Sequence, residues 1–191
     1  MTPPDDDDDF DFTKPGKAAA PPPPEKVVAA RKEAAKSSPQ LAKTGFYVAM
    51  ARNAAGRIPP RDGVRHSVLV IEDDTDLLKF VGEVLAKAGF VTRFARNRAE
   101  INGEFNKAPL PDLVLLDVRR PDADGFNILE KVRNNQKLIK MPVVMMTGRS
   151  EVTDIARGLS LGADGYVTKP FKISGLISAV NTVLGLDQSA S

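Results

Sequence analysis

Carboxylates follow two short apolar runs of the sequence. Residues 113–116 are Leu-Val-Leu-Leu and lead into Asp117, and residues 67–71 lead into Glu72 and Asp73. A short apolar run between turn residues is typical of a strand that is buried on both faces of a parallel sheet. If the two strands are neighbours, their carboxyl ends bring these acids to the edge where such sheets bind ligands. Taken alone, Asp117 fits equally well a loop cap that accepts backbone N–H bonds.

Carboxylates gathered at one point need a cation beside them. Two such charges about 5 Å apart repel each other by roughly 3 kcal/mol at an effective dielectric constant near 20. The sequence has no Cys and one His, which excludes a thiolate or multi-histidine metal site. An all-oxygen pocket suits a hard divalent ion, and Mg²⁺ is the ion that we expect. A nearby Lys side chain could also offset the repulsion between the carboxylates.

From His66 onward, apolar periodicity predicts strands that alternate with helices. Strands are expected at residues 67–71, 90–95, 113–117, 142–146 and 166–168. Apolar residues at helical spacing mark helices within residues 77–88, 98–107, 126–132, 152–159 and 173–184. This alternation indicates a doubly wound α/β sandwich with right-handed crossovers. Neither a dinucleotide-binding glycine motif nor a phosphate-binding loop ending in Gly-Lys-Ser/Thr is present, which argues against those enzyme classes.

The motifs in this part of the chain resemble those of the receiver domain of two-component response regulators. The matching residues, in chain order, are Glu72-Asp73, Asp117 with Pro121, Thr147-Gly148, Tyr166 and Lys169-Pro170. The resemblance implies a flavodoxin-like fold, with a five-stranded parallel sheet in the order 2-1-3-4-5. That order places the first and third strands side by side. We assign residues 66–187 to this receiver domain and residues 1–65 to an N-terminal extension.

The resemblance implies a phosphoacceptor and a metal site. Asp117 is expected to accept a phosphoryl group from a histidine kinase or a histidine phosphotransfer protein. Mg²⁺ is expected to be bound by Glu72, Asp73, Asp117 and the backbone carbonyl of Arg119. The protein would then be a signalling receiver that promotes its own Mg²⁺-dependent phosphorylation and dephosphorylation rather than an enzyme.

The resemblance also implies residues that bind the phosphoryl group and respond to it. Thr147 and Lys169 are expected to contact phosphoryl oxygens, Gly148 to leave room for them, and the Lys169–Pro170 peptide bond to be cis. Tyr166 holds the position of a switch aromatic that turns inward after phosphorylation. The duller interpretations are a helix cap for Thr147, a surface ion pair for Lys169 and a core position for Tyr166.

Three arginines depart from the usual family pattern. Arg119 and Arg120 lie two and three residues after Asp117, and Arg149 lies two residues after Thr147. We hypothesise that Arg119 and Arg149 overhang the phosphoryl group and alter the lifetime of the aspartyl phosphate.

The expected output of this receiver is a protein contact. The resemblance predicts a downstream target at the face formed by the fourth helix, the fifth strand and the fifth helix of the receiver. Because only a few residues follow the receiver in this sequence, we expect a receiver without an attached C-terminal output domain. No DNA-reading motif is found either, so direct DNA binding is not expected.

The N-terminal extension differs in composition from the receiver. Residues 1–13 carry six Asp and no base, whereas residues 14–65 carry eleven Lys or Arg against three acidic residues. An Asp run and a stretch of consecutive prolines cannot build a core, so we expect this extension to be largely disordered or partly helical.

Two helices are expected within the extension. Residues 25–36 are rich in Ala, Lys and Glu, and Pro39 is expected to end their helix. Residues 44–55 form the second candidate, with Phe46 and Met50 on one face.

The basic extension keeps a second class of function open. Such a segment is typical of a solvated tail, but it also suits docking on a membrane surface, nucleic acid or a filament. The alternative is therefore a phosphorylation-independent interaction or targeting protein that acts through this extension. No apolar run approaches the length of a membrane span, and the N-terminus has no signal-peptide pattern. We therefore expect a cytoplasmic protein.

Overall fold

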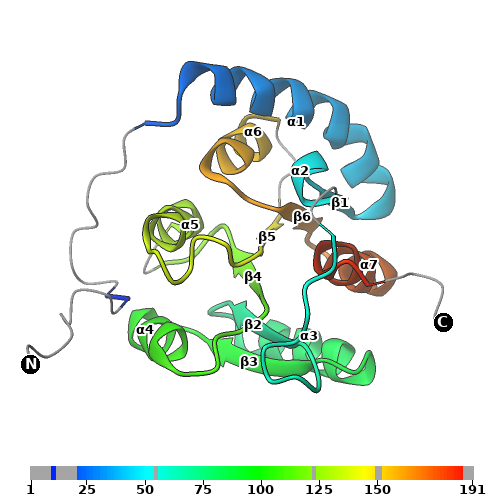
Figure 1. The fold of residues 1–191 in the computed structure, drawn as a ribbon. Coiled ribbons are helices and arrows are strands. Elements are labelled where there is room, and N and C mark those ends of the chain that lie inside the picture. Colours follow the sequence, from blue (N-terminus) through cyan, green and yellow to red (C-terminus); the bar gives the residue numbers. More distant parts are fainter. Residues whose placement is uncertain (1–9, 12–20, 54–55, 122–123, 149–151, 187–191) are drawn as a thin grey trace, which may run out of the picture.

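A six-stranded sheet forms the middle layer of the protein, with helices on both of its faces (Figure 1). The computed structural model describes residues 10–11, 21–53, 56–121, 124–148 and 152–186. The strands are β1 (Phe46–Val48), β2 (Ser67–Ile71), β3 (Val91–Ala95), β4 (Leu113–Asp117), β5 (Val143–Thr147) and β6 (Gly165–Thr168). The helices are α1 (Pro24–Thr44), α2 (Met50–Asn53), α3 (Thr75–Lys87), α4 (Arg98–Asn106), α5 (Gly125–Asn134), α6 (Val152–Leu161) and α7 (Ile173–Leu184).

The strand order is β1-β6-β5-β4-β2-β3. Strands β2 to β6 are parallel, and their order corresponds to the predicted 2-1-3-4-5 arrangement, which is confirmed. The sixth strand was not predicted. It is β1, which comes from the N-terminal extension and pairs antiparallel with β6.

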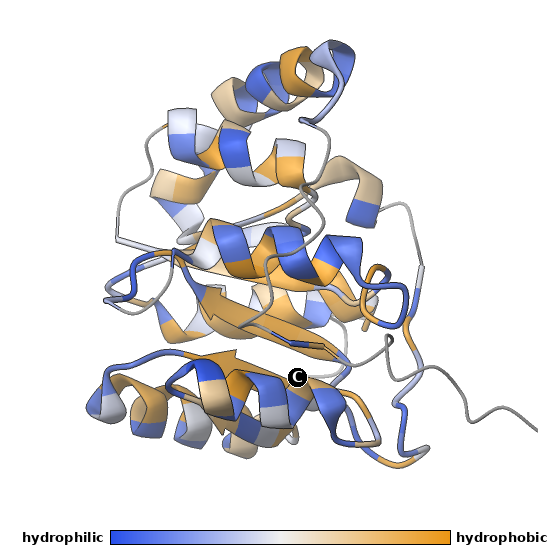
Figure 2. Ribbon diagram, turned by 90° about the vertical axis from the view of Figure 1, so that its left-hand side faces the viewer, coloured by the Kyte–Doolittle hydropathy of each residue, from blue (hydrophilic) through white to orange (hydrophobic). Residues whose placement is uncertain are grey.

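The strands carry two hydrophobic cores, one on each face of the sheet (Figure 2). Side chains of a strand alternate between the faces, so Leu69 and Ile71 of β2 pack toward α4 and α5, whereas Val68 and Val70 pack toward α3 and α7. Every residue of β4 and β5 is buried, as expected for strands covered on both sides. Among the described helices, none combines the length and the apolar character that crossing a membrane requires.

Helix α1 continues through Pro39, so the prediction that Pro39 ends it is wrong. An isolated helix of this kind is marginal in water, and tertiary packing stabilises it instead. Ala30, Ala34 and Leu41 are buried along the side of α1 that faces the receiver. Pro39 lies on the exposed side, where water can satisfy the backbone carbonyl that loses its helical partner.

The prediction of a helix at residues 44–55 is also wrong for most of that range. Residues 46–48 instead form β1, and only α2 is helical within this range. Phe, Tyr and Val favour strands, and the open edge of β6 supplies the backbone partners. The Ala49 amide donates to the carbonyl oxygen of Asp164 at 2.8 Å, which extends the contact beyond the strand itself.

The extension covers the face at which a downstream target was expected. In the receiver part of the chain, the fourth helix, fifth strand and fifth helix are α6, β6 and α7. Helix α1 packs along α6, β1 pairs with β6, and both contact this side of the molecule in Figure 1. In this structure the chain's own extension therefore lies on the face at which a downstream target is expected. The prediction of disorder for residues 1–9 and 12–20 concerns positions outside the described residues.

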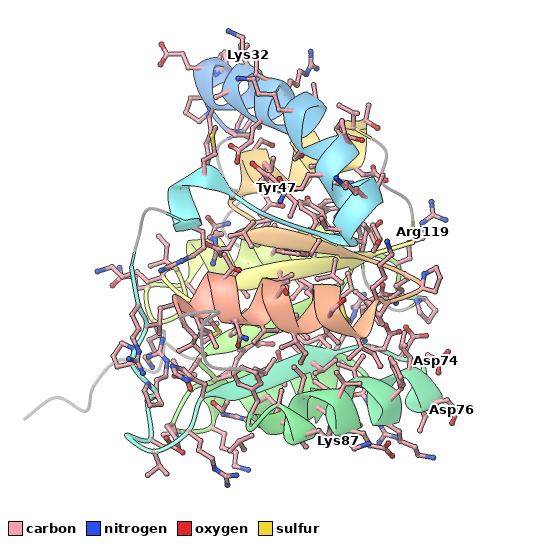
Figure 3. All side chains as sticks on the ribbon, turned by 90° about the vertical axis from the view of Figure 1, so that its right-hand side faces the viewer. Lys32, Tyr47, Asp74, Asp76, Lys87 and Arg119 are labelled. Atoms are coloured by element: carbon pink, nitrogen blue, oxygen red, sulfur yellow. The ribbon has the colours of Figure 1, made fainter. Side chains whose placement is uncertain are left out.

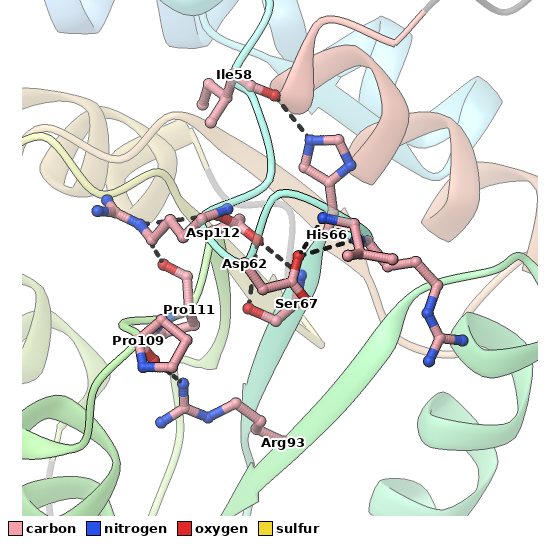
Figure 4. A network of polar contacts seen from close by, with 11 residues as sticks. Ile58, Asp62, His66, Ser67, Arg93, Pro109, Pro111 and Asp112 are labelled. Carbon is pink, nitrogen blue, oxygen red and sulfur yellow. Dashed lines mark hydrogen bonds and ion pairs between the residues drawn. The ribbon is translucent and has the colours of Figure 1, made fainter.

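A polar network fixes the segment that leads from the extension into the receiver (Figure 4). The buried carboxylate of Asp112 accepts the backbone N–H of Arg61 at 2.9 Å and that of Ser67 at 2.8 Å. The imidazole Nε2 of His66 lies 2.7 Å from the carbonyl oxygen of Ile58. These contacts join the extension to the start of β2, at the end of the sheet opposite the candidate site.

We expect Leu41→Ala to lower the free energy of unfolding by about 2–5 kcal/mol, because Leu41 is fully buried between α1 and the receiver. Val28→Ala on the same helix is the matched control. Val28 is 52% exposed, so its change should stay within about 0.5 kcal/mol. Urea unfolding of the full chain measures both values. Equal effects for the two variants would show that α1 is not part of the cooperative fold.

Candidate functional site

Two neighbouring strands deliver the carboxylates to one point. Strand β2 pairs with β4, and Ile71 lies opposite Leu116, so the residues that follow each of them emerge side by side. Glu72, Asp73 and Asp117 each offer a carboxylate oxygen, and these oxygens lie within 4.8 Å of one another. Glu72 and Asp117 are buried, whereas Asp73 is exposed.

Lys169 supplies the positive charge of the site. Its Nζ donates to Asp117 Oδ1 at 2.8 Å and to Glu72 Oε2 at 2.5 Å. The residue follows β6, and its backbone N–H donates to the carbonyl oxygen of Thr147 at the end of β5, at 2.7 Å. The Lys169–Pro170 peptide bond is cis, as the resemblance implies.

Burial and charge pairing act against each other in the site. Burial raises the pKa of Asp117, and the hydrogen bond and charge of Lys169 offset this only in part. Burial alone would lower the pKa of Lys169, but its contacts with Asp117 and Glu72 outweigh that effect and raise it. Lys169 is therefore held as a cation against the two carboxylates.

The remaining expected site residues lie around this cluster. Thr147 is buried at the end of β5, and Gly148 after it is exposed, with no heavy atom within 4 Å of where a Cβ would lie. Arg119 is exposed and lies along the same edge of the molecule as Asp74 (Figure 3). Arg149 lies outside the described residues.

Tyr166 already occupies an inward position. Its side chain is fully buried, and its hydroxyl lies 3.3 Å from the carbonyl oxygens of Asp154 and Ile155 in α6. Burial raises the pKa of this phenol. Gly158 of α6 leaves the space for the hydroxyl, since a Cβ there would collide with it. The sequence carried no signal for this partnership, because the two residues meet only after α6 packs on the sheet.

Gly125 shapes the loop that follows Asp117. It begins α5, and a Cβ on it would collide with the backbone carbonyl of Asp117 and lie 2.9 Å from the Cα of Val118. Its N–H donates to the carbonyl oxygen of Val118 at 3.0 Å. The absence of a side chain thus lets the loop after Asp117 turn back tightly on β4.

The residues of the cluster fit a hard divalent cation. The donors are carboxylate oxygens, which Mg²⁺ prefers. Both oxygens of Glu72 already accept hydrogen bonds, from Lys169 and from the backbone N–H of Asp74. The carboxylate of Asp73 is exposed and is the best placed of the three to bind a hydrated ion directly.

A parallel sheet of this order, with acids after β2 and β4 and a lysine after β6, defines a receiver domain, and the chain belongs to the response regulator receiver family. The family model for the response regulator receiver domain matches residues 68–181. Members of this family are signalling proteins that bind Mg²⁺ through acidic residues and work with histidine kinases.

Individual members are similar to this chain over the receiver part. The transcriptional regulatory protein GltR of Pseudomonas aeruginosa is 34% identical over 118 residues, which are 62% of this chain and 48% of GltR. The phosphate regulon transcriptional regulatory protein PhoB of Escherichia coli is 35% identical over 117 residues, 61% of this chain and 51% of PhoB. The chain therefore spans about half the length of these curated relatives.

Solved receiver structures share the fold. The chemotaxis protein CheY4 of Vibrio cholerae has a TM-score of 0.60 at 26% identity, over 63% of this chain and 100% of that chain. The receiver domain of the Francisella response regulator 1452 has a TM-score of 0.57 at 29% identity, over 63% of this chain and 97% of that chain.

We expect Asp73→Asn to weaken Mg²⁺ binding at least about tenfold, because it removes a charged oxygen ligand from the cluster. Asp74→Asn is the matched control. The carboxylate of Asp74 caps α3 by accepting the N–H groups of Asp76 and Leu77, and Asn caps a helix equally well. Its Mg²⁺ affinity should stay within about twofold of wild type, because the lost charge is solvent-screened. Calorimetric titration with Mg²⁺ measures both, and equal losses would contradict the assignment of Asp73.

Proposed function

We propose that Asp117 accepts a phosphoryl group from a phosphohistidine of a sensor histidine kinase or a histidine phosphotransfer protein. The observation that carries this proposal is the contact between Lys169 Nζ and Asp117 Oδ1, 2.8 Å long, within a cluster of acids at the ends of β2 and β4. A small acyl phosphate is a second class of donor for the same chemistry.

The transfer makes one bond and breaks one. A carboxylate oxygen of Asp117 attacks phosphorus, and the bond from phosphorus to the donor nitrogen breaks, leaving its electron pair on the imidazole. Lys169 pairs with a phosphoryl oxygen, and Thr147 donates its hydroxyl to another. Mg²⁺ bound by Glu72, Asp73, Asp117 and the carbonyl of Arg119 would supply charge neutralisation for the transferring group. The same groups would promote hydrolysis of the aspartyl phosphate.

The phosphoryl group would switch the chain between two binding states. It adds about −1.5 to −2 charge beside Lys169 and Thr147, which are drawn toward it. We infer that this pull stabilises the buried position of Tyr166 against the outward one. The output would be a change in the contacts of α6, β6 and α7 rather than turnover of a substrate.

The proposed partners are proteins. The curated relatives are transcriptional regulators, but they match this chain over the receiver part, so the proposal for this chain concerns the receiver step. We propose a cytoplasmic protein that takes its phosphoryl group from a histidine donor and passes the signal to a protein target without binding DNA directly.

We expect wild-type protein to gain the mass of one phosphoryl group when it is incubated with Mg²⁺ and acetyl phosphate. Asp117→Asn should gain none, because an amide is not a nucleophile of this kind. Asp76→Asn is the control, because it removes the same charge from the exposed start of α3 and should be phosphorylated normally. Asp112→Asn is unsuitable, because the carboxylate of Asp112 holds the start of β2 through the N–H of Ser67. Intact-mass spectrometry reads all three. Equal labelling of wild type and Asp117→Asn would refute the phosphoacceptor.

We expect Arg119→Ala to change the hydrolysis rate of the aspartyl phosphate, because Arg119 lies two residues beyond the phosphoacceptor at the exposed edge of the site. Arg149→Ala should act in the same direction. Lys87→Ala, which removes an exposed base at the far end of α3, is the control. Decay of the labelled species after removal of the donor gives the rates. An unchanged rate in both arginine variants would remove them as tuning residues.

A further inference from the structure

Residues 24–48, here called the docked segment, lie on the receiver as a separate binding partner would. They comprise α1, the turn at Gly45 and β1. Helix α1 buries Ala30, Ala34 and Leu41 against the receiver, and β1 adds to the edge of β6. Strand addition of this kind is a common way for a protein to bind an extended peptide.

The receiver has glycines where the docked segment comes closest. A Cβ on Gly165 of β6 would lie 2.7 Å from the carbonyl oxygen of Tyr47, and a Cβ on Gly175 of α7 would lie 2.8 Å from that of Thr44. Neither glycine has a positive φ, so backbone conformation does not require them. The space that they leave is filled by the backbone of the docked segment.

A polar contact joins the two parts of the docked segment over the sheet edge. The hydroxyl of Tyr47 donates to Glu33 Oε1 at 2.7 Å, and the N–H of Met50 donates to the same oxygen at 2.9 Å. Tyr47 lies opposite Tyr166 in the β1–β6 register, so both side chains are on the same face of the sheet. Figure 3 shows Tyr47 between α1 and the sheet, whereas Lys32 of α1 points to solvent.

The docked segment holds both ends of the loop that carries Lys169. On one side, the N–H of Thr168 donates to the carbonyl oxygen of Gly45 at 2.9 Å. On the other, Nζ of Lys172 donates to the carbonyl oxygen of Lys43 at 2.8 Å. Lys169 lies between these two anchors and contacts Asp117.

We propose that the docked segment is an intramolecular ligand of the α6–β6–α7 face that braces the Lys169 loop, so that its docking and phosphoryl binding at Asp117 strengthen each other. The coupling rests on the proposed function. With the segment docked, Lys169 is already on Asp117 and Tyr166 is already buried, which is the arrangement that a phosphoryl group would favour. Docking of the segment and phosphoryl binding at Asp117 favour the same arrangement of Lys169 and Tyr166, so each strengthens the other.

The alternative is that phosphorylation releases the docked segment from the receiver. This would require the phosphoryl group to favour a conformation of the Lys169 loop that the docked segment cannot contact. The anchors at Thr168 and Lys172 flank Lys169 without occupying its Nζ, so Lys169 can bind a phosphoryl oxygen while both anchors persist. A protein that binds this face must therefore displace residues 24–48, and phosphorylation makes that displacement harder.

The direct test uses the full chain and beryllofluoride with Mg²⁺, which together mimic a phosphoryl group on an Asp. Amide hydrogen exchange is followed at Ala49 and Thr168, whose N–H groups bond across the interface. We expect exchange at both amides to slow at least about fivefold when the mimic binds. Unchanged or faster exchange, with the mimic bound, overturns the coupling alone. Failure of ¹⁹F NMR to detect binding at Asp117, in a chain with both amides protected, overturns the proposed function and the coupling together.

A wedge variant tests the reciprocal effect. Gly175→Ala favours the helical state of α7 but pushes against the carbonyl oxygen of Thr44. Gly103→Ala in α4, where a Cβ meets no heavy atom within 4 Å, is the matched control. We expect Gly175→Ala to speed exchange at Ala49 and to weaken beryllofluoride binding at least about fivefold, and Gly103→Ala to do neither.

Leu41→Ala provides a second way to loosen the docked segment, by removing a buried contact instead of adding a collision. It should weaken beryllofluoride binding in the same direction. If either variant exposes Ala49 to exchange and leaves the affinity for the mimic unchanged, the docked segment does not brace the site and the proposal is wrong.

Discussion

The ammonium group of Lys169 holds the candidate site together. It lies between two buried carboxylates, Asp117 and Glu72, which arrive from different strands and would repel each other without it. Everything else in the site depends on where this group is held. The parallel order of β2 and β4 sets the positions of the acids, and the end of β6 sets the position of the lysine.

Strand β6 is supported from both of its edges, and this links the extension to the site. Strand β5 lies on one side and contributes Thr147, whereas β1 lies on the other and comes from the extension. A receiver of five strands would leave this edge of β6 open. Here the chain fills the edge with its own residues, so the surface that was expected to meet a target is used for an internal contact.

The convergence of Glu72, Asp73 and Asp117 could be predicted from the sequence because it depends on short-range signals. Apolar runs locate the strands, their last residues locate the ligand edge, and the family order makes the strands neighbours. The secondary structure of the N-terminal extension could not be predicted in this way. Residues 46–48 fit a helix face as well as a strand, and only the edge of β6 decides between them. Pro39 is a helix stop in isolation, and only the burial of Leu41 beyond it overrides that signal.

The roles of several glycines were equally invisible in the sequence. Gly125, Gly158, Gly165 and Gly175 each leave space for an atom that lies far away along the chain or across a tight turn. A glycine at such a position looks the same in a sequence as a glycine in an ordinary loop. Its purpose becomes apparent only when the neighbouring backbone or side chain is in place.

The measurement that tests this account most directly is a crystal structure of the full chain with Mg²⁺ and beryllofluoride. The account predicts the metal on Asp73 and Asp117, the mimic on the Asp117 carboxylate in contact with Lys169 Nζ, and residues 46–48 still paired with β6. A structure in which Lys169 turns away from the bound mimic would contradict the central claim that this lysine organises the site.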